Sequence, residues 1–167
     1  MKEKNSSKKL VIAAMLAALT CVATMVIKIP SPLNGYINLG DCFVLLAGWT
    51  LPVSYGFLSA GIGSALADVF SGYAAYAPAT FIIKGLMAVA AGYIFRAISK
   101  HTNILVARII SGISAEAIMV VGYLLFESVL YGFGPSLVNV VPNCIQGIAG
   151  LLIGTVLIKV TENKINL

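Results

Sequence analysis

Long apolar runs alternate with short polar or Gly/Pro-rich stretches along the whole chain. Apolar runs of this length predict helices, and the Gly, Pro and polar clusters mark where each helix ends. Pro52 separates two of the runs, and Pro78 suits the first turn of a helix. Six helices are predicted, at approximately 9–27, 41–51, 54–70, 78–98, 104–130 and 137–160. The pattern therefore predicts an all-α integral membrane protein with six transmembrane helices in a single domain, 1–167.

The run at 41–51 is the shortest of the six. Eleven helical residues rise about 17 Å, whereas the hydrocarbon core of a bilayer is about 30 Å thick. The segment could be a tilted partial span or a re-entrant turn, and the distribution of basic residues decides between them. With six crossings and a cytoplasmic N-terminus, Lys28 alone lies outside. The inner set is Lys2, Lys4, Lys8, Lys9, Arg96, Lys100, Arg108, Lys159 and Lys164. We therefore expect six crossings with both termini in the cytoplasm.

The composition agrees with a multi-pass membrane protein and narrows its chemistry. The chain is 59% hydrophobic and 10% charged, with a mean hydropathy of +0.97. Its net charge of +5 comes from residues at the ends of the spans, so it indicates topology and not nucleic-acid binding. The cysteines are widely spaced, and no zinc motif is present, so no metal site is expected. The sequence has no GxxxxGK[ST], HExxH or GxSxG motif, so we expect neither ATP hydrolysis nor another enzyme activity.

Five charged side chains fall within the predicted spans, and most lie toward the outer side. They are Asp41, Asp68, Lys84, Glu116 and Glu127. Ionisable groups inside a membrane are costly and usually face the bundle interior or a water-filled cavity. A buried lysine without a partner is very unfavourable, so we expect Lys84 to pair with Asp68 or Glu116. The convergence of these groups predicts a polar ligand-capture pocket open to one aqueous compartment.

Helical periodicity places further polar residues on the same faces. At about 100° per residue, Ser64 and Asp68 share one face of the third helix, and Thr80 and Lys84 share one face of the fourth. The fifth helix contributes Glu116, Tyr123 and Glu127, and the sixth contributes Asn139, Asn143 and Gln146. These amides either bind a ligand or form hydrogen bonds between helices. Amides offer both donors and acceptors, which suits a neutral ring better than a formal ion.

Aromatic residues are expected at the membrane surfaces. Tyr73 and Tyr76 lie in the loop before Pro78, where they would either cover a flat ligand as a lid or belong to the interfacial aromatic belt. Trp49, at the inner end of the second segment, is expected in that belt.

The first helix carries alanines four residues apart. The two overlapping pairs are Ala13 with Ala17 and Ala14 with Ala18. Small residues at this spacing allow helices to approach closely in lipid. The alanine face is therefore expected either to pack inside the bundle or to dock another membrane subunit.

Three blocks of the sequence carry a resemblance to a known family. They are GYINLGD (35–41), GIGSALAD (61–68) and GYAAYAPATF (72–81), the last followed by Lys84-Gly85. With the alanine pairs and the six-helix layout, they resemble the substrate-binding S component of an energy-coupling factor (ECF) vitamin importer, in the riboflavin-type subgroup. The resemblance covers essentially the whole chain. Relatives in this subgroup are assigned to riboflavin, pyridoxine or hydroxymethylpyrimidine.

The resemblance implies a multi-pass subunit in the plasma membrane of a prokaryote that binds a vitamin from outside. Its partners would be a transmembrane T subunit and two cytoplasmic ATPases, which use the ATP, so this chain itself needs no cofactor. The first-helix alanines Ala13, Ala14, Ala17 and Ala18 would dock the T subunit. The candidate substrate-binding residues are Asn38, Asp41, Asp68, Tyr73, Tyr76, Lys84, Glu116, Tyr123, Asn139, Asn143 and Gln146.

An alternative function is a stand-alone ion- or proton-coupled secondary transporter. Glu116, Asp68 and Lys84 would then form a relay within the membrane. The small size of the chain and the absence of an internal repeat count against this alternative.

Overall fold

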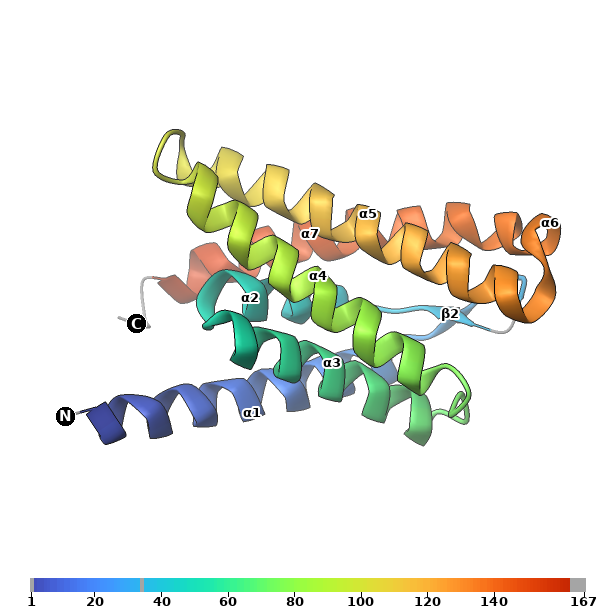
Figure 1. Cartoon of the computed structure of the whole chain (residues 1–167), viewed down its shortest axis with the longest axis horizontal. Helices are drawn as coiled ribbons and strands as arrows, with labels where there is room; N and C mark the ends of the chain where they lie inside the picture. The colour runs from blue at the N-terminus through green and yellow to red at the C-terminus, as the bar shows by residue number, and fades with distance from the viewer. Residues whose placement is uncertain (1, 34, 163–167) are drawn as a thin grey trace.

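The computed structural model describes residues 2–33 and 35–162, which form an elongated bundle of helices (Figure 1). The predicted all-α class is confirmed. The elements in chain order are α1 (Lys2–Val26), β1 (Ile29–Pro30), β2 (Tyr36–Ile37), α2 (Asp41–Thr50), α3 (Val53–Phe70), α4 (Ala77–Ile98), α5 (Ile104–Tyr131), α6 (Phe133–Ser136), the 3-10 turn η1 (Leu137–Asn139) and α7 (Val140–Glu162). The short strands β1 and β2 form a hairpin that the hydropathy pattern did not predict.

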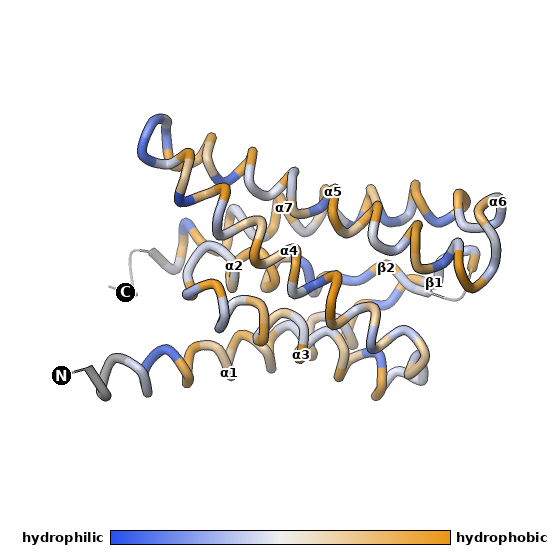
Figure 2. Tube along the Cα trace, in the orientation of Figure 1, coloured by the Kyte–Doolittle hydropathy of each residue, from blue (hydrophilic) through white to orange (hydrophobic). Residues whose placement is uncertain are grey.

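Five helical segments are long and apolar enough to cross a membrane, and α2 is a shorter apolar helix. Helix α1 begins and helix α7 ends at one end of the bundle, whereas the β1–β2 hairpin and α6 lie at the other (Figure 1). Large apolar side chains are exposed along the outside, with Val129 86% and Val141 65% exposed, and hydrophobic positions recur along every long helix (Figure 2). Such a surface suits contact with lipid and not with water.

The short helix α2 lies inside the bundle, where it contacts α1, α3, α4 and α7. Eight of its ten residues are buried. Because protein surrounds α2, its length does not have to match the bilayer. Trp49 illustrates this environment: it is 6% exposed, and its indole N–H donates to Ser111 Oγ at 3.0 Å. The expectation that Trp49 belongs to an interfacial belt is therefore wrong, and the residue is part of the core.

Glycines allow α2 to approach its neighbours closely. A Cβ atom at Gly48 of α2 would lie 2.5 Å from the carbonyl oxygen of Ala88 in α4. A Cβ atom at Gly150 of α7 would lie 2.7 Å from Cβ of Asp41, at the start of α2. Side chains at either position would push the helices apart. These crossings bring Asp41 within reach of residues from both α4 and α7.

The first and last helices differ most from their predicted bounds. α1 begins at Lys2, whereas the hydropathy pattern placed its start near residue 9. The predicted sixth helix, 137–160, is preceded by α6, begins as the 3-10 turn η1 and continues as α7 from Val140. Gly132 ends α5 with a φ of +88°, a conformation that favours glycine, and the chain then enters α6.

Candidate ligand-binding site

The segment between α1 and α2 folds over the end of the bundle opposite the termini. Its hairpin pairs Ile29 with Ile37 and Pro30 with Tyr36. Near the turn, the Ser31 amide donates to the Gly35 carbonyl at 3.0 Å. The Leu33 amide donates to Asn139 Oδ1 at 3.4 Å, which attaches the turn to η1. The hairpin is therefore held in place above the helices.

Asn38 and Gln146 connect this segment to the helices beneath it. Gln146 Oε1 accepts hydrogen bonds from the backbone N–H of Asn38 at 2.9 Å and from its Nδ2 at 3.2 Å. Asn38 Oδ1 accepts from the Gly40 amide at 2.9 Å, just before α2 begins. Gln146 Nε2 donates to Asp41 Oδ2 at 2.7 Å. This chain of hydrogen bonds joins the hairpin segment, α2 and α7.

Lys84 forms its ion pair with Asp41, through Asp41 Oδ1. The expected partners were Asp68 and Glu116, so that expectation is wrong. The reason is the tertiary packing: α2 contacts both α4 and α7, so Asp41, the first residue of α2, lies opposite Lys84. The Lys84 and Asp41 side chains are 4% and 0% exposed. The pair is therefore shielded from water.

Tyrosines form a layer at this end of the bundle. The Tyr36 hydroxyl donates to Asp68 Oδ1 at 2.7 Å, and its ring lies 4.9 Å from that of Tyr73. The rings of Tyr73 and Tyr76 meet nearly edge to face, 6.4 Å apart. Tyr123 Oη lies 3.0 Å from Thr80 Oγ1, within hydrogen-bond distance. Residues from three segments thus share one aromatic layer.

Burial governs the ionisation of the tyrosines that lie outside the helices. It raises the pKa of Tyr36 above its usual value, and the Asp68 carboxylate raises it further. Burial also raises the pKa of Tyr76, and its contact with the Tyr131 hydroxyl adds to the effect. Both phenols therefore stay protonated at neutral pH and can donate hydrogen bonds.

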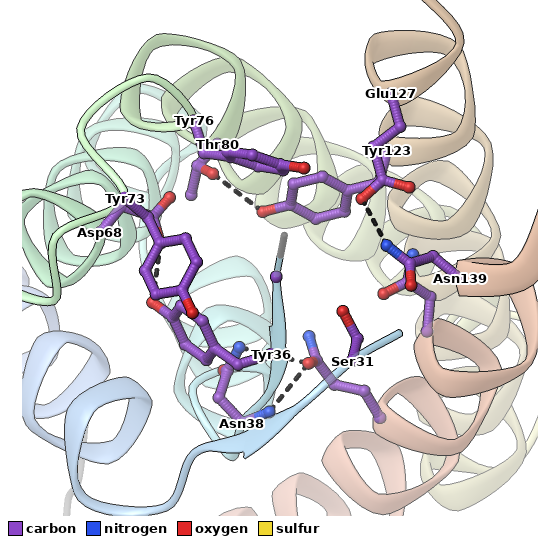
Figure 3. Close-up of a pocket in the computed structure, with 13 residues that line it drawn as sticks. Ser31, Tyr36, Asn38, Asp68, Tyr73, Tyr76, Thr80, Tyr123, Glu127 and Asn139 are labelled. Carbon is purple, nitrogen blue, oxygen red and sulfur yellow. Dashed lines mark hydrogen bonds between the residues drawn. The ribbon is translucent and has the colours of Figure 1, made fainter. Parts of the chain in front are cut away.

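A cavity of about 40 Å³ lies among these groups (Figure 3). The hairpin segment, α3, the α3–α4 loop, α4, α5, η1 and α7 all contribute to its wall. Its lining residues are Ser31, Gly35, Tyr36, Asn38, Asp68, Tyr73, Tyr76, Thr80, Tyr123, Glu127, Asn139, Asn143 and Gln146. A wall of hydroxyls, amides and carboxylates enclosed by aromatic rings can bind a small polar molecule by hydrogen bonds and stacking.

Eight of the eleven candidate residues line this cavity: Asn38, Asp68, Tyr73, Tyr76, Tyr123, Asn139, Asn143 and Gln146. Asp41 and Lys84 lie outside the wall and connect to it through Gln146. Glu116 is also outside the wall. It is 7% exposed and lies near Gly147 of α7, and neither carboxylate oxygen has a hydrogen-bond partner in the described part of the chain.

Five lining residues were not among the candidates. Helical phase had already placed Thr80 and Glu127 on the same polar faces as the candidates, although neither was named as a substrate-binding residue. Tyr36 stands in the GYINLGD block. Ser31 and Gly35 reach the cavity through the hairpin turn, and no periodic pattern marks them.

The four alanines of α1 divide between two environments. Ala13 is buried, and its carbonyl accepts a hydrogen bond from Ser59 Oγ of α3 at 2.8 Å. Ala17 is half-buried, and its carbonyl lies against Gly63. Ala14 and Ala18 are exposed. Ala14 and Ala18 are therefore the more accessible pair, but all four alanines line one apolar groove beside α3, and their docking of a partner stays a prediction.

The fold and the cavity define a helical membrane protein with a polar cavity at one end of its bundle. The chain belongs to the family of S components of ECF-type riboflavin transporters, whose family model matches residues 4–163. S components are the vitamin-binding subunits of ECF transporters. The resemblance inferred from the three sequence blocks is therefore confirmed.

Three individual proteins are similar to this chain. A Pyrococcus woesei protein, described as an uncharacterized protein in a gap 3′ region, is 35% identical over 134 residues, which cover 80% of this chain and 87% of that protein. A solved S component of a bacterial ECF transporter is 23% identical, with a TM-score of 0.75 and coverage of 97% of this chain and 99% of that one. An S component for biotin is 19% identical, with a TM-score of 0.63 and coverage of 97% and 95%. The two structures show the same fold.

Proposed function

We propose that this chain captures a water-soluble vitamin or vitamin precursor from outside the cell, in the cavity beneath Tyr73 and Tyr76. The observation that carries the proposal is a cavity lined by polar side chains, in an otherwise apolar bundle, at the end opposite both termini. The nine-to-one distribution of basic residues favours a cytoplasmic location for the termini. The cavity then faces the outside of the plasma membrane. Riboflavin, pyridoxine and hydroxymethylpyrimidine are the ligands to test first.

Ligand entry requires the aromatic cover to move. A cavity of about 40 Å³ holds a few water molecules, because each needs about 10–15 Å³. A vitamin is larger, so its binding must displace Tyr73, Tyr76 or the hairpin. The loop before α4 contains Gly72 with a φ of +86°, and a Cβ atom there would meet no neighbour within 4 Å. The loop is therefore unpacked at Gly72, whereas Tyr76 at its other end is buried against Phe126.

Delivery to the cytoplasm would depend on a transmembrane T subunit and two ATPases. Ala14 and Ala18 line an apolar groove of about 550 Å³ between α1 and α3, together with Leu58, Ile62 and Leu66. Small side chains next to exposed apolar ones allow another helix to approach closely in lipid. We assign this groove to the T subunit.

Uptake into vesicles tests the proposal. Vesicles containing this chain, a T subunit and two ATPases should accumulate labelled riboflavin, pyridoxine or hydroxymethylpyrimidine only when ATP is supplied. Vesicles containing this chain alone should bind the compound without accumulating it. Accumulation by the chain alone, driven by an ion or proton gradient, would favour the secondary transporter and contradict the proposal.

A further inference from the structure

We propose that the ligand of this cavity is a planar nitrogen heterocycle that carries a positive charge or an amino group, and that the cavity rejects phosphorylated and other anionic compounds. The inference rests on the proposed function, because it names the ligand class of the same cavity.

Two buried carboxylates in the cavity wall carry the inference. Asp68 is 6% exposed and Glu127 is 3% exposed. One oxygen of each is occupied: Asp68 Oδ1 accepts from the Tyr36 hydroxyl at 2.7 Å, and Glu127 Oε1 accepts from Asn139 Nδ2 at 2.9 Å. The other two oxygens, Asp68 Oδ2 and Glu127 Oε2, have no hydrogen-bond partner in the described part of the chain. Buried acceptors left without a donor are costly, so a ligand that brings donors is favoured.

Two positive charges lie beside tyrosines of the cavity wall but not in the wall itself: Lys84 Nζ is 5.6 Å from the ring centre of Tyr123, and Lys28 Nζ is 5.7 Å from that of Tyr36. None of the thirteen described lining residues is Lys, Arg or His. Lys84 lies outside the wall and is paired with Asp41. Lys28 is exposed and donates to Ser71 Oγ at 3.0 Å. An anionic ligand would place acceptor oxygens against the unpartnered oxygens of Asp68 and Glu127, whereas a ligand with N–H donors or a positive charge would satisfy them.

Two of the three amides that were expected to contact a neutral ring are engaged with other protein groups. Asn139 bonds to Glu127 and Leu33, and Gln146 bonds to Asn38 and Asp41. Among the buried side-chain atoms of the described wall, those without a hydrogen-bond partner are the carboxylate oxygens Asp68 Oδ2 and Glu127 Oε2. The described lining also includes four tyrosines, Tyr36, Tyr73, Tyr76 and Tyr123. Aromatic faces favour planar and cationic groups.

Matched ligand pairs test the inference on the unmodified, purified full-length chain by titration calorimetry at pH 7. The first pair is pyridoxamine, which carries a cationic aminomethyl group, and pyridoxine, which has a hydroxyl in its place. The second is 4-amino-5-hydroxymethyl-2-methylpyrimidine and its 4-oxo counterpart. Riboflavin and pyridoxine 5′-phosphate complete the set. We expect the amino member of at least one pair to bind about tenfold or more tightly than its partner, and the phosphate not to bind.

The outcomes separate the inference from the proposed function. If riboflavin, pyridoxine or the 4-oxo compound binds most tightly, the inference is overturned and vitamin capture stands. Tight binding of the phosphate would also overturn it. If no compound in the set binds and none copurifies with the chain, the proposed function fails together with the inference.

Charge-removing variants provide the second measurement. Asp68→Asn and Glu127→Gln keep the side-chain shape and remove the charge, so each should reduce the preference for the amino ligand to below about threefold. Glu116→Gln is the matched control, because Glu116 is a buried carboxylate outside the cavity wall, and the preference should stay unchanged. Tyr36→Phe frees the second Asp68 oxygen and should keep or increase the preference. An unchanged preference for the amino ligand in both Asp68→Asn and Glu127→Gln would contradict the inference. If those variants do not fold, the ligand ranking on the unmodified chain decides the question.

Discussion

Replacement of Lys84 by Met tests the buried ion pair at the centre of the bundle. Methionine has a similar length and apolar character but carries no charge, so Lys84→Met leaves the fully buried Asp41 carboxylate with the hydrogen bond from Gln146. Removal of one partner from a buried ion pair typically costs about 3–5 kcal/mol, because the remaining charge is not compensated. We expect the free energy of unfolding to fall by an amount in this range.

The assay is the free energy of unfolding in mixed micelles, measured by circular dichroism during titration with dodecyl sulfate. Lys84→Met/Asp41→Asn should recover much of the loss, whereas Lys84→Met/Glu116→Gln should not. Lys28→Met is the matched control, because Lys28 is exposed, and it should change stability by less than about 1 kcal/mol. A stable Lys84→Met variant, or equal rescue by Glu116→Gln, would refute the Lys84–Asp41 pairing.

Three further predictions concern the cavity, the groove and the topology. Asn143→Ala removes an amide of the cavity wall and should weaken binding of the vitamin about 5–150-fold in calorimetry, equivalent to about 1–3 kcal/mol, without changing the free energy of unfolding. Ala14→Trp adds bulk to the groove, so it should abolish ATP-driven uptake and leave ligand affinity intact. Leu152→Trp is the control, because Leu152 is 64% exposed and lies away from the groove, and this variant should still permit uptake. A phosphatase fused to the C-terminus should be inactive because it stays in the cytoplasm, and an active fusion would contradict the six-crossing topology.

The helices could be predicted from the sequence because each long apolar run is bounded by Gly, Pro or polar residues. Helix α4, for example, spans Ala77–Ile98, close to the predicted 78–98. The hairpin could not be predicted, since strands of two residues contain no periodic pattern. The burial of α2 could not be predicted either. An apolar helix of ten residues has the same composition whether protein or lipid surrounds it, and Trp49 was misplaced for this reason.

The cavity could be predicted in part because helical phase is local. Tyr123 and Asn143 lie on polar faces that the sequence shows directly, and both line the cavity. The partner of Lys84 depends on how α2 lies relative to α4 and α7, which no local pattern determines. The sequence also does not show that Ala13 is buried and Ala14 exposed, because this difference depends on how α1 packs against α3.

The central claim is that the cavity beneath Tyr73 and Tyr76 holds a water-soluble vitamin. Mass spectrometry of the compound that copurifies with the chain tests this claim most directly. The unmodified protein should carry one such vitamin or precursor in near-stoichiometric amount. Asn143→Trp, which places an indole in a cavity of about 40 Å³, should fold and carry none. Retention of the same compound in the same amount by Asn143→Trp would contradict a binding site in this cavity.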